Sequence, residues 1–199
     1  MKEPNKNVKQ NLALFDQWAK SYDKPLLQFW MKKFHNPVFK ELQLKKETKV
    51  LDISCGTGEL LKKLEGKADL YGIDISEEML KIAKQKLSSA TLQKADVHKL
   101  PFEDNSFDHV LSTEAFHHYY NQQKALKEMV RVTKKGGKVI VVDINFFLRP
   151  IHWLFETFEP GCVKVNNKRD LKRLFHQARL QKVHQKRNFA FAVMTVGEK

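Results

Sequence analysis

The sequence of 199 residues is long enough for one domain with a well-buried core. Its hydrophobic content of 42% and charged content of 30% are typical of globular proteins. No apolar run approaches the roughly 20 residues needed to span a bilayer, and the N-terminal stretch lacks the apolar core of a signal peptide. The two cysteines, Cys55 and Cys162, belong to no Cys/His cluster, which argues against a zinc site and favours a reducing, cytoplasmic location.

The formal net charge of +13 is concentrated at the two ends of the chain. Residues 1–50 carry 11 basic and 5 acidic side chains, residues 145–199 carry 11 and 4, and residues 51–144 carry 14 of each. Such basic flanks attract an anionic substrate, a nucleic acid or an acidic membrane surface. A lysine-rich solvated surface is an equally good interpretation, and no stable protein partner is implied.

Residues 10–46 predict two or three helices, because aromatic side chains recur there at helical spacing, punctuated by Pro25 and Pro37. From residue 48 onward, short apolar segments alternate with amphipathic ones. This alternation predicts a parallel sheet covered by helices on both faces. The expected strands are residues 49–54, 68–75, 90–96, 107–113 and 138–144, and the expected helices are residues 58–66, 76–87 and 122–133.

Beyond this pattern lies a segment, residues 146–158, with five aromatic side chains. A loop leads from it to an expected helix at residues 168–178. Two final strands near residues 180–187 and 189–196 are separated by so little chain that they predict a hairpin. No internal repeat or long linker interrupts the sequence, so we expect a single domain.

Three aspartates lie at or beside the ends of the first three expected strands, at positions 52, 74 and 96. In an open α/β sheet the ligand binds at the carboxyl ends of the strands. Three carboxylates along that edge favour a ligand with several hydrogen-bond donors and some positive charge. Gly56 and Gly58 follow Asp52, and their lack of side chains lets such a ligand approach the backbone closely.

Five stretches carry a resemblance to a known family: "FDQWAKSYD", "VLDISCGTGEL", "YGIDISEEML", "ADVHKLPFEDNSFDHVLSTEAFHHY" and "LKEMVRVTKKGGKVIVVD". In this order and spacing they resemble the class I S-adenosylmethionine-dependent methyltransferases, in particular the small-molecule branch of the ubiquinone/menaquinone biosynthesis methyltransferases. The resemblance covers about residues 15–143 and is weaker from there to the end of the chain. It implies an α/β, Rossmann-like, doubly wound sheet of seven mostly parallel strands, the last antiparallel. Residues 1–46 would be a helical cap, 47–144 the cofactor-binding core, and 145–199 a lid segment with the final helix and strands.

The resemblance also implies how S-adenosyl-L-methionine is bound as cofactor. Asp52 would attract the ammonium group, and the loop with Gly56 and Gly58 would border the methionine and ribose portion. Asp74 would accept the ribose hydroxyls, and Asp96 would accept from the adenine amino group. The other expected cofactor-binding residues are Tyr22 over the methionine end, Ser54 and Cys55 in the glycine loop, Ile75 against the adenine, the Val97 amide, and Thr113 with Glu114 beside the sulfonium.

One position departs from the family pattern. Ser54 stands where glycine is commoner, and its hydroxyl is a possible hydrogen-bond donor to the cofactor. A dinucleotide site is the alternative ligand, but Leu61 replaces the third glycine of that fingerprint. An acid before the glycines would also face pyrophosphate charge, so the dinucleotide interpretation is rejected.

Methyl transfer needs alignment of acceptor, methyl group and sulfur, and a base where the acceptor loses a proton. His117 and His118 follow the fourth strand and are the candidate catalytic residues, although the family often has "HH" here for packing and capping, which weighs against direct catalysis. Residues 145–161 are interpreted as a lid over a hydrophobic acceptor, a membrane-contacting patch or a packed helix. Neither an "NPPY"-like motif nor a Pro-Cys nucleophile follows the fourth strand, which disfavours DNA base methylation.

The sequence therefore predicts an S-adenosylmethionine-dependent methyltransferase acting on a small apolar or anionic acceptor. Two alternatives stay open. The chain is also similar to tRNA wobble-uridine methyltransferases in its "DISEEML" and "HH" motifs, and its basic flanks suit RNA. A non-catalytic cofactor-binding module that regulates a partner is the third possibility.

Overall fold

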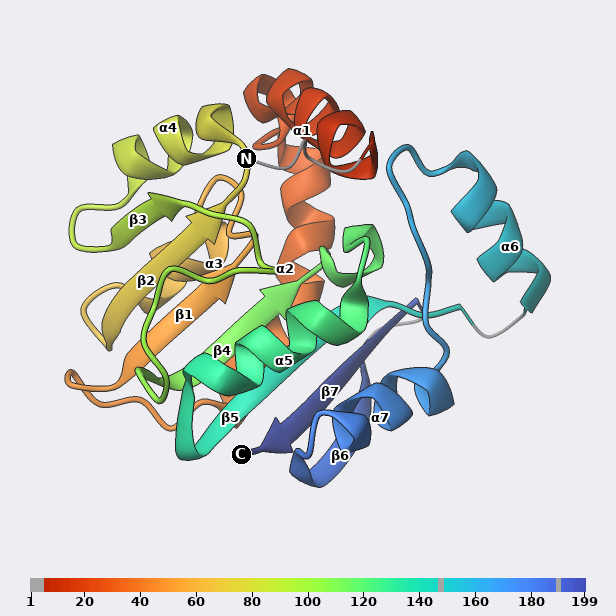
Figure 1. Ribbon diagram of the computed structural model, residues 1–199. Helices are drawn as coiled ribbons and strands as arrows, with labels where there is room; N and C mark the ends of the chain where they lie inside the picture. Colours follow the sequence, from red (N-terminus) through yellow and green to blue (C-terminus); the bar gives the residue numbers. More distant parts are fainter. Residues whose placement is uncertain (1–5, 147–148, 189–190) are drawn as a thin grey trace.

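The computed structural model describes residues 6–146, 149–188 and 191–199. Its centre is a seven-stranded sheet with the strand order β3-β2-β1-β4-β5-β7-β6 (Figure 1). The pairs within β3-β2-β1-β4-β5 are parallel, and β7 runs antiparallel to both of its neighbours. The predicted fold class is thereby confirmed. The strands are β1 (Lys49–Ile53), β2 (Asp69–Asp74), β3 (Thr91–Lys94), β4 (Phe107–Thr113), β5 (Thr133–Ile144), β6 (Gln181–Asn188) and β7 (Ala192–Glu198).

Helices cover both faces of this sheet (Figure 1). Successive side chains of a strand point to opposite faces. In β5, Val139 and Val141 therefore pack in the core beneath α5 and α7, while Ile140 and Val142 pack in the core beneath α2, α3 and α4. The helices are α1 (Lys6–Trp18), η1 (Ala19–Ser21), α2 (Pro25–Glu41), α3 (Glu59–Leu64), α4 (Glu77–Lys86), η2 (Phe116–His118), α5 (Gln122–Val132), α6 (Arg149–Phe158) and α7 (Lys168–Gln177).

The largest difference from the expected strands is at the start of β5. Residues 134–137 were expected as a turn before a strand beginning at residue 138, but β5 already begins at Thr133. The partner of Phe107 is Thr133 and that of His109 is Lys138, so the extra residues are accommodated as a bulge opposite β4. The hairpin of β6 and β7 is confirmed, while residues 189–190 of the last expected strand lie outside the described part.

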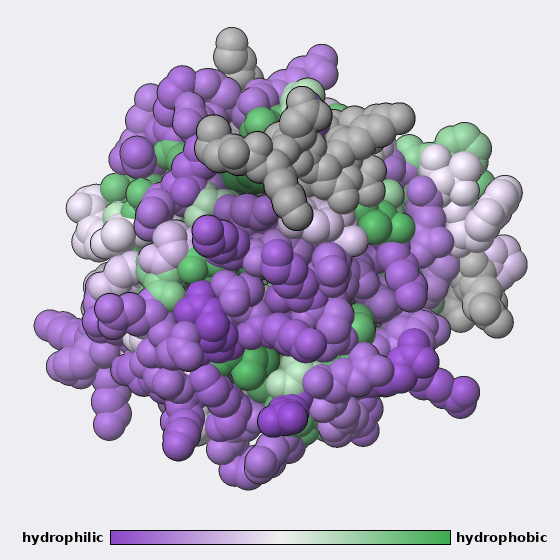
Figure 2. Space-filling model, viewed as in Figure 1, coloured by the Kyte–Doolittle hydropathy of each residue, from purple (hydrophilic) through white to green (hydrophobic). Residues whose placement is uncertain are grey.

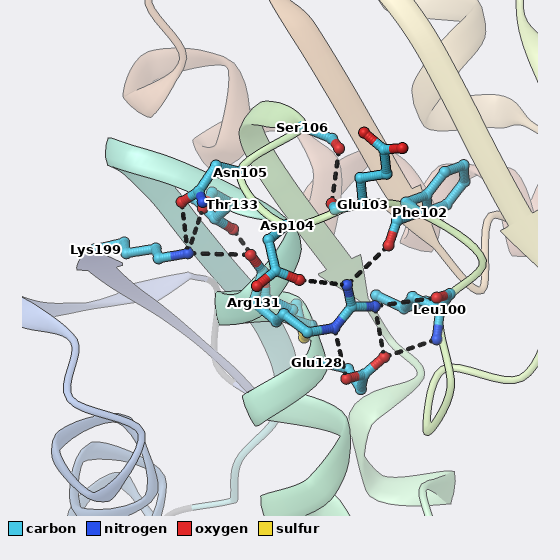
Figure 3. A network of polar contacts seen from close by, with 11 residues as sticks. Leu100, Phe102, Glu103, Asp104, Asn105, Ser106, Glu128, Arg131, Thr133 and Lys199 are labelled. Carbon is cyan, nitrogen blue, oxygen red and sulfur yellow. Dashed lines mark hydrogen bonds and ion pairs between the residues drawn. The ribbon is translucent and has the colours of Figure 1, made fainter.

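A polar network anchors the loop before β4 (Figure 3). The Arg131 guanidinium donates to the carbonyls of Leu100 and Phe102 and to the carboxylates of Asp104 and Glu128. Lys199 Nζ donates to Asn105 Oδ1 and to two backbone carbonyls at the end of α5 and the start of β5. The network ties residues 100–106 to α5 and to the C-terminus, and so sets where β4 begins.

Within the described ranges, no helix is long and apolar enough to cross a membrane.

Candidate active site

A cleft of about 780 Å³, counted with the part open to solvent, is lined by residues of α1 and by residues at the carboxyl ends of β1, β2 and β4. In Figure 1, α1 lies on the side of the sheet toward which these strands point. This is the sheet edge predicted to bind the ligand. A smaller pocket adjoins it and shares several of its walls. The predicted residues that line the cleft are Tyr22, Ser54, Gly56, Asp74, Ile75, Asp96, Val97, Thr113, Glu114 and His118; Asp52 and Cys55 line the adjoining pocket, and Gly58 and His117 line neither.

Asp74 holds the glycine loop against the end of β2. Its Oδ2 accepts from the Gly56 amide at 2.9 Å, and its Oδ1 accepts from the Ser76 amide at 2.9 Å. Burial raises the pKa of the Asp74 carboxyl, against the lowering effect of these amides. Each carboxylate oxygen has a second lone pair, so Asp74 keeps the capacity to accept ligand hydroxyls.

The backbone of the glycine loop explains the position of Ser54. Its φ of 57° is in the left-handed region, where glycine is favoured. The Ser54 hydroxyl lies 3.0 Å from the Tyr119 hydroxyl, which in turn lies 2.9 Å from the Ser112 hydroxyl. A side chain at this strained position thus gains a partly buried hydrogen bond, and the hydroxyl named as a possible donor to the cofactor is already paired with Tyr119.

Gly58 has a packing role rather than a place in the cleft. It has a φ of 80° and caps the start of α3. A Cβ atom there would lie 2.8 Å from Leu87 Cδ1 and 3.2 Å from Ala83 Cβ. At Gly56, by contrast, a Cβ would meet only Tyr22 Cε1, at 3.9 Å. The close approach of a ligand therefore concerns Gly56, and Gly58 lets α3 and α4 pack together.

Asp52 is a buried carboxylate that has no hydrogen-bond partner among the described residues at either oxygen. Its side chain lies in the adjoining pocket with Tyr22 and Cys55. Burial first, and the nearby Asp74 second, raise the pKa of Asp52 well above its usual range. A buried carboxylate is costly unless a cation or donor pairs with it, so the pocket suits a positively charged group.

Asp96 is the third of the predicted acidic residues, and it contacts His98 and Tyr120. Its Oδ1 accepts from the His98 amide at 2.9 Å and lies 2.6 Å from His98 Nδ1. The His98 ring stacks on Tyr120, with centroids 3.7 Å apart. Although burial raises the pKa of Asp96, the His98 contacts outweigh it and lower that pKa. An ionised acceptor beside flat rings suits a planar heterocycle that carries an amino group.

The N-terminal segment covers the cleft. Asn11 and Phe15 of α1 line it together with Tyr22. Asn11 Nδ2 donates to the His118 carbonyl at 3.2 Å, and the Phe15 ring meets the His118 ring edge-on at 5.1 Å. Tyr22 thus lines the cleft beside α1, and its expected place over the methionine end of the ligand stays a prediction.

The two histidines differ in their surroundings. His117 is buried behind the cleft wall, with its Nδ1 2.6 Å from Asp143 Oδ1. His118 lines the cleft, and its Nδ1 lies 3.0 Å from the Gly161 carbonyl. Burial, followed by the neighbouring His117, lowers the pKa of His118 to about 3. His118 is therefore neutral near pH 7 and presents a polar nitrogen, whereas His117 does not reach the cleft.

Sequence reasoning missed the cleft residues Asn11, Phe15, His98, Tyr119 and Tyr120. Asn11 and Phe15 reach the cleft only because α1 crosses the edge of the sheet, and the strands at that edge are far from α1 in sequence. His98 and Tyr120 meet through a stack that joins the loops after β3 and after η2. The only available signal was their position, within a few residues of Asp96 and of the "HH" motif.

The comparisons with known proteins agree with this geometry. The model of the methyltransferase domain family matches residues 51–141. A demethylmenaquinone methyltransferase of Staphylococcus aureus is 31% identical, over 89% of this chain and 88% of the relative. Two solved structures share the fold: a possible histamine N-methyltransferase of Thermotoga maritima (22% identity, TM-score 0.76, 94% of this chain and 99% of that one) and a phosphoethanolamine N-methyltransferase of Haemonchus contortus in complex with S-adenosyl-L-methionine (15%, 0.72, 93% and 60%).

The chain belongs to the class I S-adenosylmethionine-dependent methyltransferases. It is an enzyme of small-molecule methyl transfer, and neither the tRNA-modifying nor the non-catalytic alternative is favoured. Its cofactor is S-adenosyl-L-methionine. The residues present fit that molecule, because the unpaired Asp52 suits its ammonium group and the acceptors Asp74 and Asp96 suit its hydroxyl and amino donors.

Proposed function

We propose that this enzyme methylates a small apolar acceptor of the quinol or phenol class, bound between the cofactor and α1. The observation that carries the proposal is the wall formed by Phe15, Ala115 and His118, which is apolar apart from the neutral imidazole. An acceptor with a flat ring and one hydroxyl group suits such a wall. The relative from Staphylococcus aureus, whose name refers to demethylmenaquinone, supports the same class.

Each of the expected binding residues would contact a different part of the cofactor. We infer that Asp52 pairs with the ammonium group and Asp74 with the ribose hydroxyls, while Asp96 and the Val97 amide hold the adenine against Ile75. Thr113 then borders the sulfonium, and the backbone at Gly56 makes room for the ligand. Tyr22 and α1 exclude water above it, which favours an in-line displacement.

His118 is proposed to orient the acceptor. Its Nδ1 is engaged with the Gly161 carbonyl, so the neutral ring has Nε2 available to accept a hydrogen bond. His117 supports the cleft wall from its buried side, through its contact with Asp143. Of the two histidines predicted to be catalytic, we therefore propose that His118 orients the acceptor and that His117 supports the cleft wall.

Transfer of a labelled methyl group from S-adenosylmethionine into fractionated cell extract tests the proposal. We expect the label in an organic-solvent fraction, unaffected by ribonuclease. Label confined to RNA, and lost on ribonuclease treatment, would replace the proposed acceptor by tRNA. Cofactor binding without transfer to any fraction would favour the regulatory module.

An acidic membrane surface is the partner that the exposed residues support best. In α6, Ile151, Trp153, Leu154 and Phe158 are exposed, and Figure 2 shows apolar side chains over this helix beside a largely hydrophilic face. The next helix, α7, presents a basic face. An apolar helix face near cationic side chains is typical of interfacial binding. The basic side chains on that face of α7 are Arg169, Lys172, Arg173 and His176.

Vesicle sedimentation tests whether the protein binds an acidic membrane surface. We expect binding to vesicles with anionic headgroups and loss of binding for Trp153→Ser, with high salt weakening the interaction. Binding to bulk tRNA instead, unaffected by Trp153→Ser, would contradict it. The described cysteines, Cys55 and Cys162, are both free, which supports the predicted cytoplasmic location.

A further inference from the structure

Glu114 borders the cleft directly after β4, at the edge where the strands end. Its φ of 53° turns the chain there, and its amide donates to the Val142 carbonyl at 2.8 Å, which fixes the backbone to β5. Its Oε2 is buried and has no hydrogen-bond partner in the described part of the chain. A carboxyl group on a fixed backbone, with one buried oxygen unpaired in a ligand-binding cleft, is poised to meet a ligand group.

The charged and titratable groups that act on Glu114 come from η2, β5 and the N-terminal cover. His117 of η2 and Asp143 of β5 form the buried pair behind it, and Tyr22 lies close to it on the cleft side. Asp74 lines the same cleft. Burial raises the pKa of Glu114 to about 8; Asp143 adds to this rise and His117 opposes it. A carboxyl with such a pKa takes up a proton readily near neutral pH.

His118, Tyr22 and His117 are poorer candidates than Glu114 for taking up the proton. The low pKa of His118 makes its imidazole a weak base. Burial raises the pKa of the Tyr22 hydroxyl, so that Tyr22 stays protonated. His117 has a raised pKa but lies outside the cleft, with Nδ1 committed to Asp143. Glu114 remains as a titratable group at the end of β4 that lines the cleft, and its Oε2 has no partner among the residues described.

We propose that Glu114 is the catalytic base, whose carboxylate takes the proton that the acceptor loses as it is methylated. In this step the bond from the acceptor atom to the methyl carbon forms, and the sulfur–methyl bond breaks with its electron pair left on sulfur. The acceptor proton moves to a Glu114 oxygen, so the charge of the sulfonium is balanced by neutralisation of the carboxylate. The proposal rests on the proposed function, because it requires an acceptor that carries a removable proton.

The same placement couples the charge of Glu114 to the ligand. A sulfonium beside the carboxyl favours its ionised form, since an opposite charge nearby lowers the pKa of a carboxyl group. Glu114 should therefore release a proton when S-adenosylmethionine binds. S-adenosylhomocysteine carries the same ammonium group but no sulfonium, so any protons linked to Asp52 are common to both ligands. The difference between the two ligands isolates the group that faces the sulfonium.

Turnover measurements test the chemical role. We expect kcat/KM of the unmutated enzyme to rise with pH. Glu114→Gln should remove this rise and lower kcat about 100-fold or more, while the Kd for S-adenosylmethionine changes only a few-fold. Glu159→Gln is the matched control, because Glu159 is a half-buried carboxyl that also faces His117 but does not line the cleft. A Glu114→Gln enzyme that keeps its kcat and pH profile overturns the proposal.

Proton release on binding tests the placement independently of any acceptor. Calorimetry at pH 7 in buffers of different ionisation enthalpy should show S-adenosylmethionine releasing up to about one proton more than S-adenosylhomocysteine. This difference should vanish in Glu114→Gln and persist in Glu159→Gln. Absence of binding by the unmutated protein would show that the proposed function has failed. Binding with no difference between the ligands, or a difference that survives in Glu114→Gln, overturns the role of Glu114 alone.

Discussion

At the scale of single residues, Ser54 combines an unfavourable backbone with a favourable hydrogen bond. Its left-handed φ penalises any side chain, while its hydroxyl pairs with Tyr119. Ser54→Ala loses the hydrogen bond and keeps the strain, so we expect it to lower the free energy of unfolding by about 1 kcal/mol. Ser54→Gly loses the bond but relieves the strain, and should be about 1 kcal/mol more stable than Ser54→Ala. Urea denaturation of the two variants measures the difference; equal stabilities would argue against backbone strain at this position.

Glu114 also makes the stability of the ligand-free protein depend on pH. The pKa of this carboxyl is about 8 in the folded state, above its ordinary value in the unfolded chain. Between these values the folded protein binds more protons, so this contribution to stability is present at low pH and lost as the pH rises. Glu114→Gln removes the effect. Its stability relative to the unmutated protein should rise from pH 5 to pH 8, by at most about 1.4 kcal/mol per pH unit. Denaturant titrations across this range measure it, and a constant difference would contradict the raised pKa.

At the scale of elements, α1 is held over the cleft by a close packing contact. A Cβ atom at Gly161 would lie 1.7 Å from Asn11 Oδ1. Gly161→Ala must therefore displace Asn11, and we expect faster hydrogen exchange in α1 and weaker cofactor binding. Gly66→Ala is the matched control, because Gly66 has nearly the same φ, 74° against 75°, but nothing within 4 Å of its added Cβ. If both variants change exchange in α1 equally, the contact does not hold the helix.

The loop before β4 depends on one side chain. Arg131 satisfies two carbonyls of the loop and the carboxylates of Asp104 and Glu128 (Figure 3). Its loss removes this donor from the partly buried carbonyls of Leu100 and Phe102, so Arg131→Ala should lower the free energy of unfolding by about 2 kcal/mol. Arg173→Ala breaks only an exposed pair with Asp170 and should cost below about 0.5 kcal/mol. Thermal unfolding of both variants distinguishes a structural network from a surface ion pair.

At the scale of the whole molecule, the strand–helix alternation predicted the sheet, because hydrophobic periodicity is a local property of the chain. The acids Asp52, Asp74 and Asp96 could be placed at one edge for the same reason. Contacts between distant segments could not be predicted. The pairing of Ser54 with Tyr119, and the packing of Gly58 against Leu87, depend on how loops and helices meet in three dimensions. The bulge opposite β4 was missed because its residues, 134–137, are typical of a turn.

We infer that binding of the cofactor depends on the unpaired carboxylate of Asp52, with Asp74 beside it. Titration calorimetry with S-adenosylmethionine tests it most directly. We expect the unmutated protein to bind, Asp52→Asn to bind about 30- to 100-fold more weakly, and Asp69→Asn to bind normally, since Asp69 lies at the opposite end of β2. S-adenosylhomocysteine should show the same loss, because it carries the same ammonium group. No binding by the unmutated protein, or full affinity in Asp52→Asn, would contradict the account.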